Sequence, residues 1–503
     1  MPGLGMRRVA WPRGKVAGGS SAVNGLLWVR GQAADFDGWA AAVCDPRWSA
    51  ASTLPRFERI EREMQVGPSR CGMQHTDRPT AAFIAAAAHL GVQTAADVGG
   101  RFRGSFAGAG ASALQEGAGM LPVSVTPEGV RASSAAAYLE PALADSARDL
   151  ELVLGAHVDR LTFGVAAGAA AGGSGAGGGR DNRPACTGVQ YTTAGGTVMR
   201  AELEPGGEVV LAAGAIGSPH ILLASGVGPP AQLERCATTV PLVSASPAVG
   251  QHLQDHLQIR ANFRSLAPTL NDRVNSVLGL AKMTAEYTLR RTGPLTMSPT
   301  PAAAFVRSRS VVDRHCASGG GSDGVACNTS APERAGSGSP GRPDLQLHFG
   351  PWTAADREVS RGSIFRALDP FSAFTITACQ LRPTSSGSVV LASASTVDAP
   401  LIQPNFLSTE EDASAAVRAV RTLQAFARAP PLRDVIDRGA TSSLLDGAVS
   451  DADALAYARA NSSSIYHSAG TCRMGLHGHD SVVDAELRVH GVGSLRVADA
   501  SIM

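Results

Sequence analysis

The sequence predicts a mixed α/β protein of at least two domains, and three observations support this. A chain of 503 residues can bury two sizeable hydrophobic cores. Residues 208–215 (EVVLAAGA) have the pattern of a buried strand that ends at glycine and leads into a helical segment. Residues 408–411 (STEE) form a capping box, and the apolar stripe after it predicts a helix that Pro430 and Pro431 end.

Local patterns also predict the elements around this framework. After the strand at 208–215, Ser218 and Pro219 suit the N-cap and the first position of a helix. A strand, a tight turn and a helix N-terminus together let a phosphate or an electron-rich ring meet free N–H groups. Two strand-like runs enclose residues 164–185, which are rich in alanine and glycine and predict a flexible hairpin loop. Residues 316–342, rich in glycine and serine, predict a second flexible insertion.

The composition argues against several classes of function. Lys and Arg number 44 and Asp and Glu 43, and the formal net charge of +1 does not suit a general binder of nucleic acid or anionic membranes. No apolar run approaches the roughly 18 residues that a transmembrane helix needs. The N-terminus lacks a signal-peptide pattern, and none of the eight cysteines forms a C-x-x-C pair. We therefore expect an intracellular protein with reduced thiols.

The most informative segment is residues 13–31 (RGKVAGGSSAVNGLLWVRG). Its Gly-Gly-Ser-Ser corner buries almost no apolar side chain, but it can bring backbone N–H groups and small hydroxyls close to a flat or anionic ligand. Further motifs occupy residues 214–229 (GAIGSPHILLASGVGP), 466–475 (YHSAGTCRMG) and 495–501 (LRVADAS). In this order, the motifs resemble the signatures of the glucose–methanol–choline (GMC) family of FAD-dependent oxidoreductases, and they span nearly the whole chain.

The resemblance implies a discontinuous, Rossmann-like FAD-binding domain made of residues 1–264 and 465–503. Residues 265–464 would form a substrate-binding domain, an antiparallel sheet backed by helices. Family members begin with a βαβ unit whose G-x-G-x-x-G loop holds the ADP half of FAD. They usually continue past the last motif to a second catalytic His or Asn. Neither feature is found here, so the chain is expected to be truncated at both ends.

His467 is the candidate catalytic base. Oxidation of an alcohol requires a group that accepts the hydroxyl proton, and histidine has an ordinary pKa of about 6.5, close to the working pH. In the family, the histidine of the Tyr-His-x-x-Gly-Thr pattern faces the flavin N5, and His467 matches it. His348, in residues 344–350 (DLQLHFG), alternates with apolar residues on a predicted strand. It is either a structural histidine or, as the resemblance implies, a substrate contact in the roof of the active site.

Other polar residues are expected to be structural. Asp255 and His256 match a family segment that supports the flavin domain, and they receive no catalytic role. His477 and His479 lie in a loop with no further ligands in register, so no metal site is expected.

The resemblance also implies which residues bind FAD. The expected contacts are Ala17, Gly18, Ser21, Asn24, Gly25, Leu26, Leu27, Val158, Asp499 and Ala500. Val23 stands where some relatives carry a histidine that binds the flavin covalently, so noncovalent FAD is expected. The family prefers a larger aliphatic residue at position 17, and Ala17 is expected to loosen the packing there.

The leading hypothesis is an FAD-dependent alcohol dehydrogenase or oxidase that resembles choline dehydrogenases. It would oxidise a primary alcohol, choline-like or aliphatic, by hydride transfer to the flavin with His467 as general base. One alternative is a lyase similar to fatty acid photodecarboxylases, because Arg382 could hold a carboxylate. The presence of His467 and the lack of a cysteine near Ser363 count against it. Another is a fragment that cannot retain FAD. The alcohol, the electron acceptor, the oligomeric state and the organelle are left open.

Overall fold

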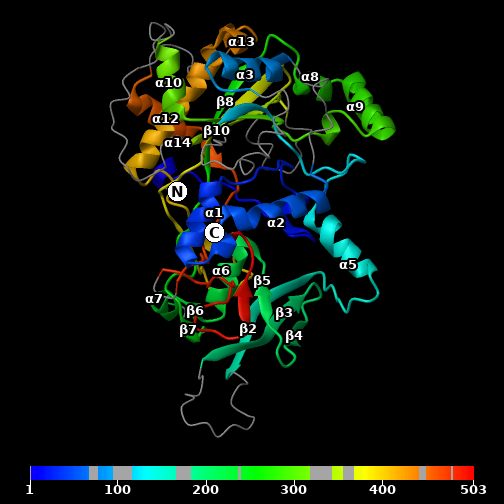
Figure 1. The fold of residues 1–503 in the computed structure, drawn as a ribbon, viewed down its shortest axis with the longest axis vertical. Coiled ribbons are helices and arrows are strands. Elements are labelled where there is room, and N and C mark those ends of the chain that lie inside the picture. Colours follow the sequence, from blue (N-terminus) through cyan, green and yellow to red (C-terminus); the bar gives the residue numbers. More distant parts are fainter. Residues whose placement is uncertain are drawn as a thin grey trace.

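The computed structural model describes residues 2–66, 78–94, 116–165, 183–235, 240–317, 342–354, 368–440, 449–476 and 480–503. Its elements form two halves along the long axis of the molecule (Figure 1). One half holds a large antiparallel sheet with its helices, and the other holds several small sheets around helix α6 (Gly214–Ala224). The fold is therefore mixed α/β, as the sequence predicts.

The large sheet has six strands and is antiparallel throughout. In spatial order its strands are β1 (Gly117–Met120), β9 (Ala302–Val306), β10 (Leu345–Gly350), β11 (Ala373–Gln380), β8 (Leu257–Arg264) and β14 (Ser462–Ser464). Strands β1 and β8 precede residue 264, while the other four follow it. The sheet therefore takes strands from both sides of the predicted domain boundary, and the division into 1–264 with 465–503 and 265–464 stays a prediction.

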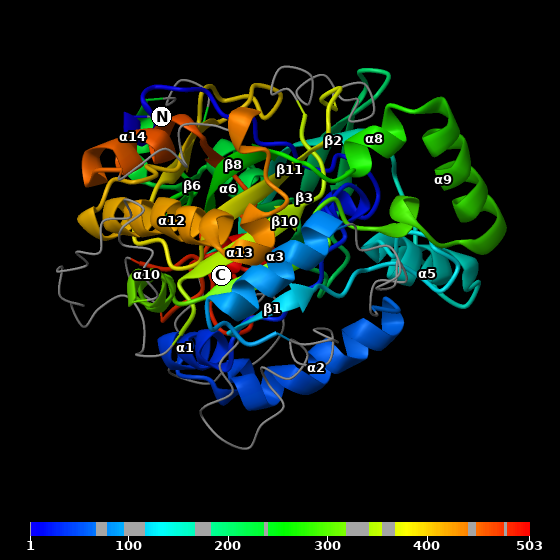
Figure 2. The same ribbon diagram turned by 90° about the horizontal axis from the view of Figure 1, so that it is seen from above.

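The two faces of this sheet differ in character because side chains alternate along each strand. Leu347, Phe349 and Ile376 lie on one face and belong to the larger hydrophobic core. Gln346 and His348 lie on the opposite face of β10. Helices cover the apolar face, as Figure 2 shows. They are α3 (Arg78–His89), α10 (Ser308–Ala317), α12 (Glu410–Arg428), α13 (Pro430–Arg433) and α14 (Asp451–Ala460).

Helix α12 confirms the predicted capped helix. Thr409, within the STEE segment, is the N-cap, and its side chain accepts a hydrogen bond from the backbone N–H of Asp412. The helix ends at Arg428, just before Pro430. Most of its residues are buried because the helix lies between the sheet and the neighbouring helices α10 and α14.

The second half of the molecule joins segments that are far apart in the chain. Strand β15 (Leu495–Val497) pairs in parallel with β5 (Val209–Leu211), so the end of the chain returns to the half that holds α6. The discontinuous domain that the sequence predicts stays a prediction, but its two segments are in contact at this strand pair. The other small sheets are β2 (Ala156–Val165) with β3 (Pro184–Thr193) and β4 (Val198–Glu202), β6 (Val227–Gly228) with β7 (Ser244–Ala245), and β12 (Ser388–Val390) with β13 (Leu401–Gln403).

In this half, one predicted helix cap is wrong and one predicted hairpin is present. Helix α6 begins at Gly214, so the expectation that Ser218 is its N-cap is wrong. Ser218 lies fully buried inside the helix, where its hydroxyl bonds to a carboxylate from the end of the chain. The predicted hairpin is present, because β2 and β3 pair up to Val165 and Pro184. Most of 164–185 and 316–342 lies outside the described residues.

The cysteines that the structure describes include free thiols and one in a disulfide bond. Cys44, Cys186, Cys379 and Cys472 are free thiols. Cys316, at the end of α10, forms a disulfide bond, so the expectation of reduced thiols is wrong at this residue. The prediction rested on sequence spacing, which does not show which cysteines the fold brings within bonding distance.

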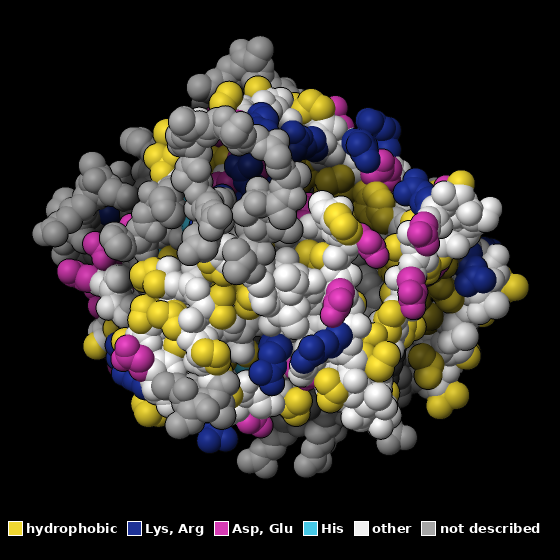
Figure 3. Space-filling model, turned by 90° about the horizontal axis from the view of Figure 1, so that it is seen from below, with side chains coloured by type: hydrophobic (Ala, Val, Ile, Leu, Met, Phe, Trp, Pro, Cys, Tyr) yellow, Lys and Arg dark blue, Asp and Glu magenta, His cyan; other side chains and the backbone are white. Residues whose placement is uncertain are grey.

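The remaining helices lie around the junction of the halves and along one side. They are α1 (Ala33–Val43), α2 (Ala50–Glu63), α5 (Glu140–Ala144), α7 (Pro230–Glu234), α8 (Leu270–Val274) and α9 (Val277–Arg290). Charges of both signs are scattered over the face that Figure 3 shows. Among the described residues, no helix combines the length and the apolar character needed to cross a lipid bilayer.

Candidate active site

Glycine and serine give the first motif its shape. Gly18 and Gly19 have φ angles of +86° and +54°, in the left-handed region that favours glycine, and a short 3₁₀ turn follows at Gly19–Ala22. The hydroxyl of Ser21 donates to the carbonyl of Gly18 at 2.5 Å and accepts from the backbone N–H of Ser134 at 2.9 Å. Ser21 therefore fixes the turn, while Ala17 and Gly18 stay half-exposed beside it.

The second part of this motif lies against the large sheet. The Asn24 side-chain carbonyl accepts from the backbone N–H of Leu26 at 3.0 Å and from Arg131 at 2.7 Å, and Leu26 has a φ of +68°. Leu27 packs against Ala303 and Phe305 on the sheet face opposite the helical layer. Asn24 and Gly25 remain exposed between these anchors. The loop is thus held against the face of the sheet that carries His348.

His348 lies in the middle of that face. It is on β10, directly opposite Ala303 of β9 and Thr377 of β11, and its side chain is only 5% exposed. Its Nε2 is buried and makes no hydrogen bond within the described part of the chain. Burial, followed by the charge of His467, lowers the pKa of His348 to about 3, so the imidazole is neutral near pH 7. A buried nitrogen without a partner is suited to bind a ligand atom.

His467 reaches the same region from the edge of the sheet. Beyond the β8–β14 pair, Gln254 and Ala469 exchange two backbone hydrogen bonds of 3.0 and 2.9 Å, so the pairing continues irregularly past the strands. Tyr466 has a φ of +70°, which is strained for a bulky residue. Asp255 accepts a hydrogen bond from the Ser464 hydroxyl, three residues before His467. These contacts fix the direction in which the side chain of His467 points away from the backbone.

Three imidazoles meet here, although the sequence predicted a functional role for only two of them. The Nδ1 atoms of His256 and His467 lie 3.2 Å apart, and the charge of His467 lowers the pKa of both His256 and His348. His467 is exposed to solvent, yet the protein around it, with Arg13 as the second cause, lowers its pKa to about 4. His467 is therefore a neutral imidazole near pH 7 that groups from the solvent can reach.

Arg13 connects the first motif to the third. Its guanidinium donates to the hydroxyl of Ser468, the residue after His467. Burial lowers the pKa of Arg13, while the Asp255 carboxylate opposes that shift. No local sequence pattern indicates the contact of Arg13 with Ser468 or that of His256 with His467, because both contacts join distant segments of the chain.

Asp499 and Ala500 lie at the N-terminus of α6. The Asp499 carboxylate accepts from the backbone N–H of Gly214 at 2.8 Å and from the Ser218 hydroxyl at 2.5 Å. The Ala500 carbonyl accepts from the backbone N–H of Gly470 at 3.3 Å. The second and third motifs and the last strand are therefore bonded to one another. A contact of Asp499 with the cofactor stays a prediction, since its carboxylate already holds the helix.

Val158 lies apart from the histidines. It is on β2, half-buried against the core of the second half, and its carbonyl accepts from the Thr396 hydroxyl at 3.0 Å. Strand β2 contacts α6, so Val158 lies in the half of the molecule that holds α6. Its adenine contact likewise stays a prediction.

The residues at this site fit a flat, partly anionic cofactor. A Cβ added at Gly19, Gly25 or Gly214 would meet no atom within 4 Å, so these backbones face open space. Leu27 gives an apolar contact beside them, and the N-terminus of α6 adds backbone N–H groups and a helix dipole. Open backbone and an apolar contact suit a flat ring with phosphates, and the unpartnered Nε2 of His348 is left to bind a further ligand atom.

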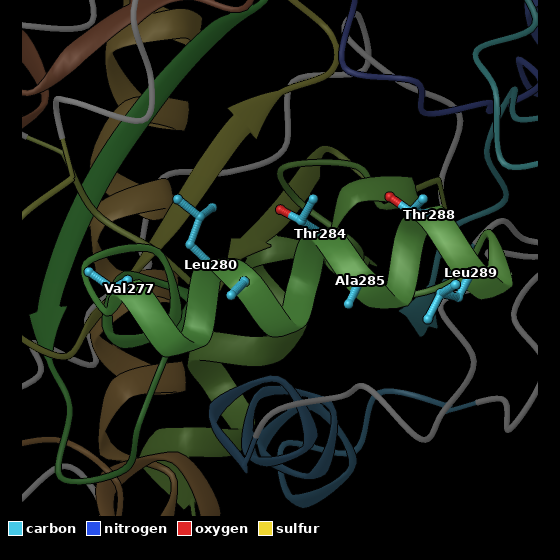
Figure 4. A pocket seen from close by; sticks show the side chains of 7 residues that line it. Val277, Leu280, Thr284, Ala285, Thr288 and Leu289 are labelled. Atoms are coloured by element: carbon cyan, nitrogen blue, oxygen red, sulfur yellow. The ribbon is translucent and has the colours of Figure 1, made fainter.

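Two surface hollows lie away from the histidines. One of about 710 Å³ runs along α9 (Figure 4), lined by Val277, Leu280, Ala281, Thr284, Ala285, Thr288 and Leu289. Another of about 430 Å³ is lined by Gly18, Ser134, Ala135, Tyr138, Leu139 and Ala142. Neither contains His348 or His467, so the histidine cluster locates the candidate site better than size does. Within the described ranges, no cluster of three or more His, Cys, Asp or Glu could hold a metal ion. His477 and His479 fall outside those ranges.

Solved structures share this arrangement. A variant of formate oxidase from Aspergillus oryzae RIB40 matches with a TM-score of 0.74 and 21% identity, over 98% of this chain and 80% of that one. An FAD-dependent oxidoreductase from Chaetomium thermophilum matches with a TM-score of 0.74 and 20% identity, over 99% and 84%. At these identities the likeness defines the fold. The chain therefore has the fold of these solved structures.

Sequence comparison defines the family more narrowly. Two family profiles described as GMC oxidoreductase match residues 3–258 and 383–503. The chain belongs to the GMC oxidoreductase family, and it is an FAD-dependent oxidoreductase, as its motifs predicted.

Three curated relatives illustrate the range of this family. An uncharacterized GMC-type oxidoreductase of Mycobacterium tuberculosis is 33% identical over 100% of this chain and 82% of its own length. The alcohol dehydrogenase (acceptor) of Pseudomonas putida is 30% identical over 99% and 79%. The mitochondrial choline dehydrogenase of Mus musculus is 31% identical over 100% and 73%.

Proposed function

We propose that this oxidoreductase oxidises a primary alcohol, choline-like or aliphatic, with His467 as the general base. Its relatives include an alcohol dehydrogenase and choline dehydrogenases, which supports an alcohol as the donor. The observation that carries the proposal is the pair of neutral imidazoles at one site. His467 is exposed to solvent, and His348 has a buried Nε2 with no partner within the described residues.

Each histidine has a distinct task in this proposal. With a pKa of about 4, His467 is unprotonated near pH 7 and can accept the hydroxyl proton of the alcohol. His348, neutral and fixed in a central strand, holds the same oxygen through Nε2. FAD, when bound, supplies the acceptor for the hydride that leaves the carbon. His348 is fixed by the sheet, while His467 follows β14 at the edge of the same sheet.

The cofactor contacts complete the proposal. FAD would be held noncovalently, because Val23, exposed in the first motif, offers no nucleophile. The residues proposed to hold it are Ala17, Gly18, Ser21, Asn24, Gly25, Leu26, Leu27, Val158, Asp499 and Ala500. Ser21 and Asn24 act by fixing the loop, since their side-chain oxygens already bond within the protein.

The lyase alternative requires a free cation for a carboxylate. Arg382 instead donates to Asp35 at 2.6 Å and to Gln32 at 2.8 Å, and Arg342 shares the same partners. The engaged guanidinium favours the alcohol over a fatty acid as substrate. Ser363, the other position considered, lies outside the described residues.

Anaerobic flavin reduction tests this function. The FAD-loaded protein is mixed with choline or an aliphatic primary alcohol, and bleaching of the flavin band near 450 nm is followed. His467→Ala should slow bleaching by about 10²- to 10⁴-fold without lowering flavin absorbance, because only the proton acceptor is lost. His89→Ala, an exposed histidine at the end of α3, is the matched control and should keep the wild-type rate.

Three results would contradict the proposal. They are an unchanged rate in His467→Ala, hydrocarbon release from a fatty acid only under blue light, and a colourless protein that does not take up FAD.

A further inference from the structure

The imidazole of His256 contacts the candidate base directly. The two Nδ1 atoms are 3.2 Å apart, and the rings meet edge to face with centroids 5.3 Å apart and an interplanar angle of 70°. Two bare nitrogens would repel each other, and two N–H groups could not bond. One Nδ1 therefore carries a proton and donates a hydrogen bond, and the other Nδ1 accepts that bond.

The proposed role of His467 decides which ring is the donor. A neutral imidazole has a single N–H, so a ring that accepts the substrate proton through Nε2 carries its own proton on Nδ1. His467 then donates its Nδ1–H to Nδ1 of His256. Nδ1 of His256 is therefore the bare acceptor, and the proton of that ring is on Nε2.

The surroundings keep His256 neutral. Burial lowers its pKa to about 3, and the charges of His467, Arg382 and His348 act in the same direction. Asp255, next to it in the chain, accepts a hydrogen bond from the Ser464 hydroxyl instead. His256 therefore retains its bare Nδ1 over the range in which the enzyme would work.

We propose that His256 is a positioning residue. It accepts a hydrogen bond from the Nδ1–H of His467 and so keeps the Nε2 of His467 bare for the substrate hydroxyl. The inference rests on the proposed function of His467. In the opposite tautomer, Nε2 would carry the proton, and His467 could donate to the alcohol but not accept from it. Once His467 has taken up the substrate proton, its Nδ1–H still bonds to His256, which stabilises the charged ring.

Two substitutions separate this role from a structural one. His256→Phe keeps a ring but removes the acceptor, and flavin reduction at saturating alcohol should slow by about 10- to 100-fold. KM should change by less than about threefold, because binding groups are untouched. The acid limb of the pH profile should move to lower pH, since the protonated His467 loses its partner. His256→Asn places a side-chain oxygen near the position of Nδ1 and should recover most of the rate.

The control is Gln254→Ala, an exposed side chain in the same segment, which should leave the rate unchanged. Equal slowing in the Phe and Asn variants with full flavin absorbance would overturn the inference. So would a wild-type rate in His256→Phe while His467→Ala is slow, and the proposed function would then stand alone. If His467→Ala keeps the wild-type rate, the proposed function is wrong, and the inference about His256 is wrong with it.

A measurement on the wild-type protein avoids any folding defect of the variants. In ¹⁵N NMR of the histidine-labelled holoenzyme at neutral pH, His467 should show a protonated Nδ1 and a bare Nε2. A protonated Nε2 would overturn the inference.

Discussion

The strand that carries His348 and the loop that carries His467 reach the same site by different means. Strand β10 is regular and wholly buried, and both neighbouring strands fix its register. The loop after β14 has left-handed φ angles at Tyr466 and Gly470. It is held by bonds from distant segments, such as Thr471 to the Ala215 carbonyl at 2.6 Å. The sheet provides a fixed wall, whereas the loop depends on partners supplied by the rest of the chain.

The largest expected effect comes from removing a partner of the loop half. Asp499→Ala deletes the carboxylate that accepts from Gly214, Ser218 and Ser501. The free energy of unfolding should fall by about 2–4 kcal/mol, because buried donors at the start of α6 lose their acceptor. Urea denaturation measures this. Glu208→Ala, which removes an exposed ion pair to Arg496 in the same strand pair, should change stability by less than about 1 kcal/mol. Equal effects of the two would contradict the comparison.

On the sheet side, the expected effect depends on pH. The pKa of His348 is about 3 in the folded protein, and about 6.5 is the ordinary value in an unfolded chain. Between these values only the unfolded state binds the proton, so stability falls as the pH drops from about 6.5 towards 3. The slope from this group is up to about 1.4 kcal/mol per pH unit.

His348→Gln removes that titration and should flatten the slope between pH 6 and pH 4 in chemical denaturation. Asp255 acts in the opposite sense, because burial raises its pKa to about 6, but it is present in both proteins. An identical slope in the two proteins would show that His348 is accessible to protons in the folded state.

The smallest expected effect is a difference in the sign of the stability change between two glycine-to-alanine substitutions. Gly18 has a φ of +86°, and a Cβ there would lie 3.1 Å from Ala135, so Gly18→Ala should lower stability by about 1–2 kcal/mol. Gly38 lies exposed in helix α1 with no atom within 4 Å of a new Cβ. Gly38→Ala should raise stability by about 0.5–1 kcal/mol. Thermal unfolding of both variants measures the difference. Two changes of the same sign would mean that the loop is not held in its left-handed turn.

The sequence predicts the regular parts of this molecule well. Alternation predicts β10 with His348, and the capping pattern with Pro430 predicts both ends of α12. Ser218 was misassigned as an N-cap because serine before proline is a strong local signal. In the fold, its hydroxyl instead bonds to Asp499, far along the chain. Local propensity yields to such a tertiary contact.

The candidate site is predictable only in part for the same reason. The motifs point to His467 and to the loop around Gly18, but not to His256 as the partner of the base. That contact arises because strands β8 and β14 pair across about 200 residues of sequence, and no local pattern records it. For the same reason, no local pattern indicates that β1 and β8 join the large sheet.

The central claim is that the loop around Gly18 and the imidazole of His467 face one flavin. A crystal structure of the FAD-loaded protein tests it most directly. We predict an isoalloxazine ring against Gly18–Leu27, with His467 on its substrate side and His348 beyond it. A ring bound elsewhere, such as in the hollow along α9, or packed side chains between His467 and the flavin, would contradict the account.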